Sequence, residues 1–268
     1  MTNILRTEFF RLRKYKTFWV MLGIVVVLPI VGWALSRVLV AILLMTGYPG
    51  GELTARITFS ALSGMADIGT LPDLLGLICT AIFLSKEFTD GTIRNAILST
   101  KTRKQIYFGY LVVALTIGLS LKIANYVSSL TVYGLAWGFG STKAADAAVG
   151  CFASLLLALL STAFVQSCTV MFLFTGKKQS TALIFPILIV VVGSGAVELL
   201  VSIVELVINI NGNLSEEWKT WIPLYNVQYF DAEAVDGGIF AKIATYWALF
   251  TAMFIAIGHN SFKKADLK

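Results

Sequence analysis

Charged residues are scarce in this 268-residue sequence. They make up 13% of it, about half of the roughly 25% that is usual in soluble domains. A soluble domain of this size could not cover its apolar surface with so few charges. Hydrophobic residues make up 57% of the chain, and they fall in long blocks rather than in alternation. The lipid bilayer is the solvent that makes such a composition stable, and the long blocks exclude a transmembrane β-barrel.

Residues that usually carry catalysis or bind metals are also few. His259 is the single histidine, so no second histidine is present for a zinc site. Cys79, Cys151 and Cys168 lie in apolar stretches without CxxC spacing, which predicts small buried side chains rather than disulfides or metal ligands. The phosphate-binding pattern G-x-x-x-x-G-K-[ST] is absent. We therefore expect no catalytic site, no metal and no bound cofactor in this chain.

Long apolar stretches predict an all-α integral membrane protein with six transmembrane helices, in one domain that covers residues 1–268. About twenty residues at 1.5 Å per residue cross the hydrocarbon core of a bilayer. The second span is the shortest, and we expect it to begin inside a glycine-rich loop over residues 46–71. A polar outer segment, residues 209–238, precedes the last span. The expected spans are 18–37, 72–84, 106–137, 147–174, 181–208 and 239–258.

Residues 1–17 predict an amphipathic helix that lies on the membrane surface before the first span. Its apolar residues recur at roughly helical spacing, and its arginines and lysines fall mostly elsewhere. A basic tail without regular structure is the alternative. We expect no cleavable signal peptide, because the first sixteen residues are too charged. The apolar residues of this segment are Ile4, Leu5, Phe9, Leu12 and Tyr15.

The distribution of basic residues predicts the orientation. Net charge is +6, and most Lys and Arg residues flank apolar blocks, which indicates membrane topology rather than nucleic-acid binding. Fifteen of the 21 lie in segments expected on the side of the N-terminus, four lie on the other side, and Arg37 and Lys122 lie within apolar runs. The positive-inside rule therefore places both termini in the cytoplasm.

The inner segment at residues 85–105 holds the densest group of polar residues near the second span. Gly91 is expected to end one helix and Thr92 to cap the next, so that a short surface helix would face a cytoplasmic partner. An ordinary solvated loop is equally compatible with the sequence. The candidate residues are Glu87, Asp90, Gly91, Thr92, Arg94 and Asn95.

The run from Glu87 to Asn95, followed by Thr102 and Arg103, resembles the E-x-x-x-G-T signature of ABC-2 type transporter permeases. The layout is similar to that family over the whole chain, with an N-terminal elbow helix, six spans and a long outer segment before the last span. The motif itself covers only about twenty residues. Tyr110 is one departure, because many family members carry a lysine at that position.

The resemblance implies that two permease domains pair, as a homodimer or a heterodimer, and that each docks on a cytoplasmic P-loop ATPase. ATP and Mg would be bound by that separate polypeptide. The loop around Glu87 would pass the motion of the ATPase to the spans, with Glu87 as the electrostatic link and Arg94 beside it. The transported solute would be hydrophobic or amphipathic, such as an antimicrobial peptide, a lipid-like compound or a drug, and the membrane a bacterial plasma membrane.

Charged residues inside the spans are functional candidates by default. Glu198 and Glu205 are seven residues apart, so they lie on roughly one face of a helix, and Lys122 lies in the third span. They are candidates for a substrate pathway, for pairing with one another, or for the outer interface. Asp67 and Asp73 are taken as loop or span-cap residues.

Two other functions share this topology. A standalone ion-coupled transporter or channel would use Arg37, Lys122, Glu198 and Glu205 as its ion pathway. A membrane anchor or assembly factor would transport nothing. An adjacent reading frame for a P-loop ATPase distinguishes the permease from both.

Overall fold

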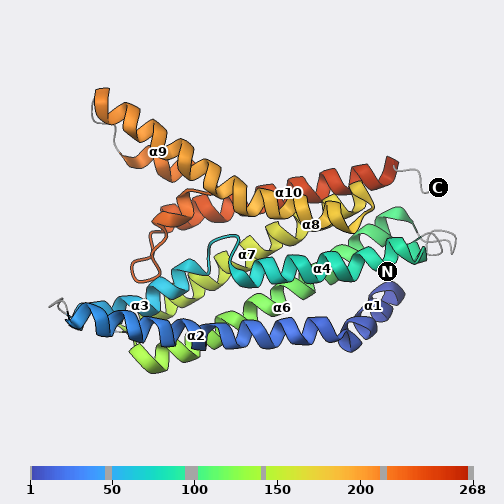
Figure 1. The fold of residues 1–268 in the computed structure, drawn as a ribbon. Coiled ribbons are helices and arrows are strands. Elements are labelled where there is room, and N and C mark those ends of the chain that lie inside the picture. The colour runs from blue at the N-terminus through green and yellow to red at the C-terminus, as the bar shows by residue number, and fades with distance from the viewer. Residues whose placement is uncertain (1, 46–49, 94–101, 140–142, 212–215, 265–268) are drawn as a thin grey trace.

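The computed structural model describes residues 2–45, 50–93, 102–139, 143–211 and 216–264. Every regular element in this described part is helical, and the helices form an elongated bundle (Figure 1). The N-terminus and the C-terminus lie at the same end of the bundle, which we call the α1 end. The opposite end is called the α3 end.

Five helical segments are long and apolar enough to cross a membrane, which confirms five of the six expected spans. The segments Arg103–Trp137 and Ala144–Gly176 are the most buried, and the others expose much of their apolar surface to the surroundings of the bundle. Their helices are α2 (Lys16–Met45), α6 (Arg103–Trp137), α7 (Ala144–Gly176), α8 (Gln179–Ile187) continuing into α9 (Gly193–Asn211), and α10 (Gly237–Lys264).

The segment in which the second span was expected contains two helices, which corrects the sequence-based boundaries. Residues 46–71 were expected to form a loop, but α3 (Gly50–Gly64) occupies most of this segment. Its glycines are confined to its ends, and its interior residues are compatible with a helix that packs on α6. After a short break, α4 (Leu71–Thr89) continues toward the α1 end. Asp73, Lys86 and Glu87 give α4 a higher proportion of charged residues than any of the five long helices has. A sixth span therefore stays a prediction.

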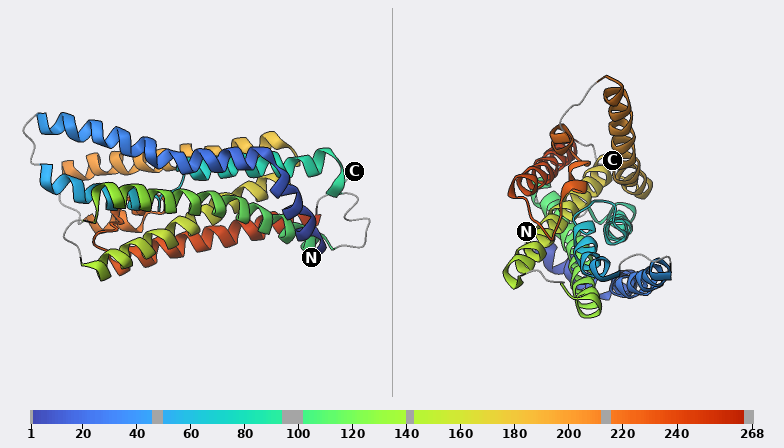
Figure 2. Two further views of the ribbon diagram at one scale, coloured as in Figure 1. Left: turned by 90° about the horizontal axis from the view of Figure 1, so that it is seen from below. Right: turned by 90° about the vertical axis from the view of Figure 1, so that its left-hand side faces the viewer.

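Residues 1–17 contain helix α1 (Thr2–Lys14), which meets α2 at a sharp bend (Figure 2), and its position on the membrane surface stays a prediction. The indole N–H of Trp19 donates to the carbonyl of Arg13 at 2.8 Å, which satisfies one of the free carbonyls at the end of α1. Leu12 is buried against the bundle, and Leu5 and Tyr15 are packed against the same core. Phe9 and Phe10 instead remain exposed. Some of the apolar residues expected on one face of α1 therefore pack against the protein core, and others stay exposed.

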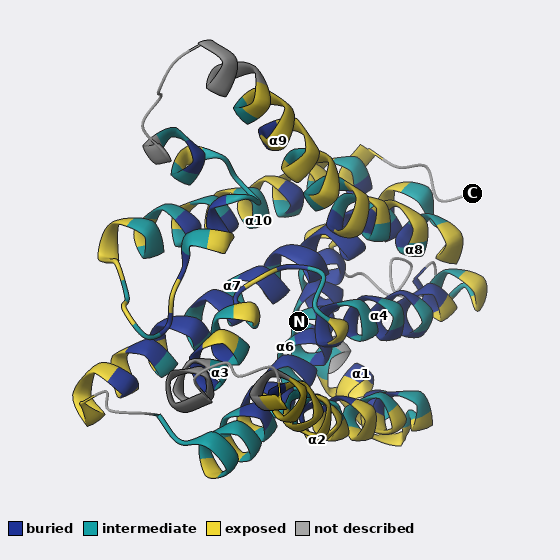
Figure 3. Cartoon of the chain, turned by 60° about the vertical axis from the view of Figure 1, so that its left-hand side comes forward, coloured by how far each residue is buried: buried dark blue, intermediate teal, exposed yellow. Residues whose placement is uncertain are grey.

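Helices α4, α6 and α7 form the centre of the bundle. Figure 3 shows buried residues concentrated on these helices, whereas α2 and α9 are largely exposed. Helix α9 also leans away from the bundle, beyond a π-helical turn at Leu188–Val192. Pro186 precedes that turn and has no N–H for the helical ladder, which gives a physical reason for the irregularity.

Small residues allow α4 and α6 to approach closely. Gly76 of α4 and Gly118 of α6 face each other beside the side chain of Gln166 of α7, and a Cβ built on Gly118 would lie 2.6 Å from that side chain. Close approach at glycine is a common basis of helix packing in membranes. The close packing of α4 against α6 therefore depends on the absence of a side chain at Gly76 and Gly118.

The outer segment expected over residues 209–238 is irregular where it is described. It contains two short 3₁₀ helices, η2 (Glu216–Trp221) and η3 (Asn226–Tyr229). The backbone N–H of Ala232 donates to the hydroxyl of Ser63 at 2.9 Å, which fixes this segment on α3.

We expect Gly118→Leu to destabilise the fold by about 1–3 kcal/mol, because added methylenes in a filled core displace their neighbours. Gly23→Leu is the matched control, since nothing lies within 4 Å of a Cβ built there on α2. Thermal unfolding of the purified chain in detergent measures both. Equal stability of the two variants would contradict this view of the α4–α6 contact.

Candidate functional site

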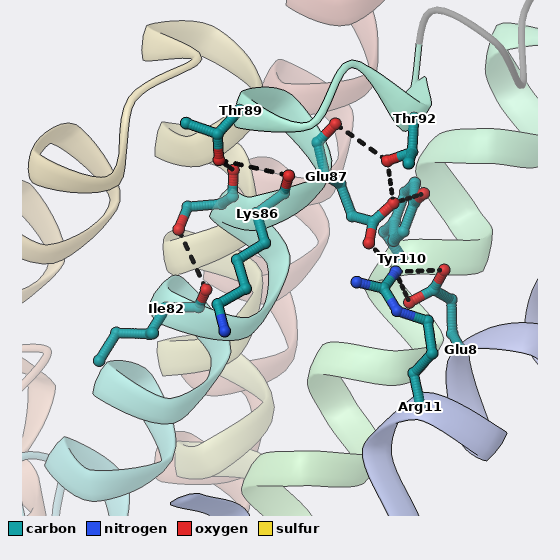
Figure 4. Close-up of polar contacts among 9 residues, drawn as sticks. Glu8, Arg11, Ile82, Lys86, Glu87, Thr89, Thr92 and Tyr110 are labelled. Carbon is teal, nitrogen blue, oxygen red and sulfur yellow. Dashed lines mark hydrogen bonds and ion pairs between the residues drawn. The ribbon is translucent and has the colours of Figure 1, made fainter. Parts of the chain in front are cut away.

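A polar cluster at the α1 end is centred on Glu87, in the last turn of α4 (Figure 4). Only 2% of Glu87 is exposed. A carboxylate near the C-terminus of a helix is unfavourable beside the negative end of the helix dipole, and burial adds a desolvation cost. The side chain therefore needs positive and hydrogen-bonding partners from other elements.

Helix α1 supplies the positive partner. Arg11 forms an ion pair with Glu87 and also contacts both carboxylate oxygens of Glu8 at 3.3 Å. Burial raises the pKa of the Glu8 carboxyl, while Arg11 acts in the opposite direction. One guanidinium thus holds two buried carboxylates and ties α1 to the end of α4.

Tyr110 of α6 completes the contacts of Glu87. Its hydroxyl donates to Glu87 Oε2 at 3.1 Å. A neutral hydroxyl group therefore lies beside the buried carboxylate. Glu87 consequently joins α4 to both α1 and α6.

The connection that follows α4 is shorter than residues 85–105, because α4 continues through Thr89 and α6 already begins at Arg103. Gly91 has a φ of +67°, so it ends α4 in the left-handed conformation that favours glycine, as predicted. The Thr92 hydroxyl turns back to Glu87, bonding its backbone carbonyl at 3.1 Å and its carboxylate. Asp90 and Thr92 are exposed. Arg94 and Asn95 lie outside the described residues.

The start of α6 is fixed by its own sequence. Thr102 and Gln105 form a capping box, with reciprocal side chain to backbone hydrogen bonds of 3.3 Å. The Arg103 guanidinium donates to the carbonyls of Phe262 and Lys263 at 3.2 and 2.8 Å. These contacts hold the last turn of α10 beside the Glu87 cluster.

A second cluster lies in the middle of the bundle. Lys122 of α6 and Asp73 of α4 are both fully buried, and their Nζ and Oδ2 atoms are 2.7 Å apart. Lys122 also donates to the hydroxyl of Thr70 at 2.8 Å, and Thr70 donates to Asp73 Oδ2 at 2.7 Å. Thr162 of α7 donates to Asp73 Oδ1 at 2.6 Å. Three helices therefore meet at one carboxylate.

The local sequence of α4 explains why Asp73 sits there. Thr70 precedes the helix, and Pro72 occupies its first turn, where a missing N–H costs nothing. Asp73 follows in that turn, next to the positive end of the helix dipole. The start of α4 and the Lys122 ammonium group therefore both place positive charge beside the buried Asp73 side chain.

The other intramembrane charges do not join this cluster. Glu198 accepts a hydrogen bond from Gln228, and Glu205 forms an ion pair with Lys219. Both contacts tie α9 to the outer segment. Lys122 pairs with Asp73 instead of with either glutamate, so the candidate pathway residues are divided between separate places.

Arg37, the fourth charge of the ion-pathway hypothesis, lies near the α3 end of α2. It stacks on the ring of Trp137, with 4.4 Å from Cζ to the ring centroid. This agrees with the expectation that it lies near a span end.

A cavity of about 970 Å³ opens near the α3 end, between α3, the break before α4 and the outer segment. Asp67, Asp231 and Glu233 line it, together with apolar residues such as Phe59 and Phe230. None of the described residues that line this cavity is basic. Nor does the described part of the chain place three His, Cys, Asp or Glu side chains where they could hold a metal ion.

Sequence reasoning missed three partners: Arg11, Asp73 and Tyr110. Each contact joins residues far apart in the chain, so no local spacing reports it. One signal was available, because an intramembrane lysine and an intramembrane aspartate each require a partner. Asp73 lies at the start of one apolar run and was therefore one candidate partner for Lys122.

Comparison with known proteins gives one match. The family model described as ABC-2 family transporter protein matches residues 4–196. The matched region includes the Glu87 cluster and the Asp73–Lys122 pair, and it ends before the outer segment. No curated protein and no solved structure matches the chain.

Lys122→Met leaves Asp73 as a buried charge without its cation, and we expect it to destabilise the fold by about 3–5 kcal/mol. The double variant Lys122→Met/Asp73→Leu should recover most of that loss, since apolar replacement of a buried pair is often neutral. Thermal unfolding in detergent compares them, with the exposed Glu198→Gln as control. A double variant less stable than Lys122→Met would contradict the pairing.

Proposed function

Because this chain belongs to the ABC-2 transporter family and is a membrane permease of an ABC transporter, we propose that it exports a hydrophobic or amphipathic solute with energy from a separate ATPase subunit. The observation that carries the proposal is the exposed turn at Asp90–Thr92, directly behind Glu87 and within the matched region. This is the place at which the family resemblance expects the ATPase to dock.

The α1 end faces the cytoplasm in this proposal. Basic residues gather there, in α1, at the start of α6, in the α7–α8 turn and in the last turn of α10. The positive-inside rule places such an end in the cytoplasm of a bacterial plasma membrane. Helices α3 and α4 together serve as the sixth crossing.

Coupling runs along α4. The ATPase would bind ATP and Mg and contact the connection at Asp90, Thr92 and the residues that follow, where Arg94 and Asn95 keep their proposed role. Glu87 is buried, so it acts on the ATPase only through this turn. Its contacts with Arg11 and Tyr110 make α1 and α6 move with α4, and the Asp73 cluster carries that displacement to α7.

The cavity at the α3 end supports an amphipathic solute with a positive charge. Its acidic residues would favour a cationic group, and its aromatic walls would bury apolar surface. Lipid or a second permease copy would cover the exposed apolar faces of α2, α8 and α9. Both features fit a peptide or drug that leaves through the outer half of the membrane.

The docking site is tested by co-purifying the chain with a candidate P-loop ATPase. We expect Asp90→Asn to weaken association about fivefold, which is the usual effect of a charge at the rim of an interface. Asp146→Asn is the matched control, because Asp146 is an exposed acid at the α3 end. Equal retention of the ATPase by the wild type, Asp90→Asn and Asp146→Asn would place the docking site elsewhere. If no ATPase co-purifies with the wild type, the result argues against the ATP-driven function.

A further inference from the structure

A second, smaller cavity lies between α1 and α4 at the α1 end. Its volume is about 230 Å³, which suits a headgroup rather than a whole solute. Three cations from two helices line it, and three aromatic side chains form the rest of its wall. The lining residues are Phe10, Arg11, Lys14, Tyr15, Phe83 and Lys86.

The cations of this cavity are held over aromatic rings. Lys14 Nζ lies 4.3 Å from the ring centroid of Phe10, and Lys86 Nζ lies 5.2 Å from that of Tyr15. Arg11 Cζ is 5.6 Å from the ring centroid of Phe83. These contacts preorganise the three positive charges around one space.

The nearby carboxylates do not neutralise all three cations. Glu8 and Glu87 are buried behind Arg11 and pair with it. Within the described residues, neither Lys14 nor Lys86 forms an ion pair with an acid. Two lysines thus face the cavity with their charge available for an anion.

We propose that this cavity binds the phosphate of one anionic phospholipid headgroup. A phosphodiester supplies the negative charge and the acceptor oxygens that lysine and arginine recognise. Phe10, which lines the cavity, is 60% exposed, and exposed apolar surface continues along α2, where Trp19 is 52% exposed. Such surface requires acyl chains as cover, which favours a lipid over free phosphate.

The proposal goes beyond the transport function and depends on it only for placing the α1 end at the membrane surface. Arg11 is left unchanged in the test, because it also holds Glu87. Lys14 and Lys86 line only the cavity and are the residues to substitute.

The experiment is native mass spectrometry of the purified full chain, titrated with phosphatidylglycerol or phosphatidylcholine. We expect the first phosphatidylglycerol to bind more tightly than phosphatidylcholine. Lys14→Gln/Lys86→Gln should weaken that first binding by roughly 25-fold, or about fivefold for each lysine. The control Arg13→Gln/Lys104→Gln removes two exposed cations of the same end that do not line the cavity, and it should bind like the wild type.

Two further variants and one competitor complete the test. Lys14→Arg/Lys86→Arg keeps the charge and should retain binding, which separates a charge effect from misfolding. Inorganic phosphate should not displace the lipid, and displacement at millimolar concentration would identify a free-phosphate site instead. The proposal would be overturned if Lys14→Gln/Lys86→Gln and the control Arg13→Gln/Lys104→Gln weakened phosphatidylglycerol binding equally. Equal affinity of the wild type for phosphatidylglycerol and phosphatidylcholine would also overturn it. No ATPase is present, so the result is independent of the transport function.

Discussion

Inside a bilayer no water is available to a buried charge, so every charged group in the centre of this bundle must find its partner within the protein. Asp73 and Lys122 meet that requirement in each other, with Thr70 and Thr162 filling the remaining oxygen contacts. Because these residues come from α4, α6 and α7, satisfying one carboxylate also fixes how three helices pack. Helix α4 is shorter than α6 and α7 and has a higher proportion of charged residues, and it is accommodated because these two helices pack around it.

The same helix carries a second anchored carboxylate at its other end. Glu87 is held by Arg11 of α1 and by Tyr110 of α6, immediately before the exposed turn that begins at Asp90. Helix α4 is therefore attached at both ends to other helices through buried charges. In the proposed function, these contacts would transmit a displacement of the turn to α1 and α6.

Apolar length was sufficient to predict the five long helices, and the local pattern of residues 1–17 was sufficient to predict a helix before the first of them, because these features depend on local composition. Gly91 as the end of α4 was also predictable from its residue type. Helix α3 was missed because glycines at its ends made the segment resemble a loop. The pairing of Lys122 with Asp73, and of Glu87 with Arg11, joins positions separated by many residues. Such contacts depend on the packing of whole helices, and no spacing within one segment specifies them.

The central claim is that the turn at the end of α4 is the surface on which the ATPase acts. A photo-crosslinking amino acid at position 90, in the intact membrane with the ATPase co-expressed, tests it most directly. The account predicts an adduct between the two proteins from position 90 and none from position 146 at the opposite end. An adduct from position 146, or none from position 90 while the complex still co-purifies, would contradict it.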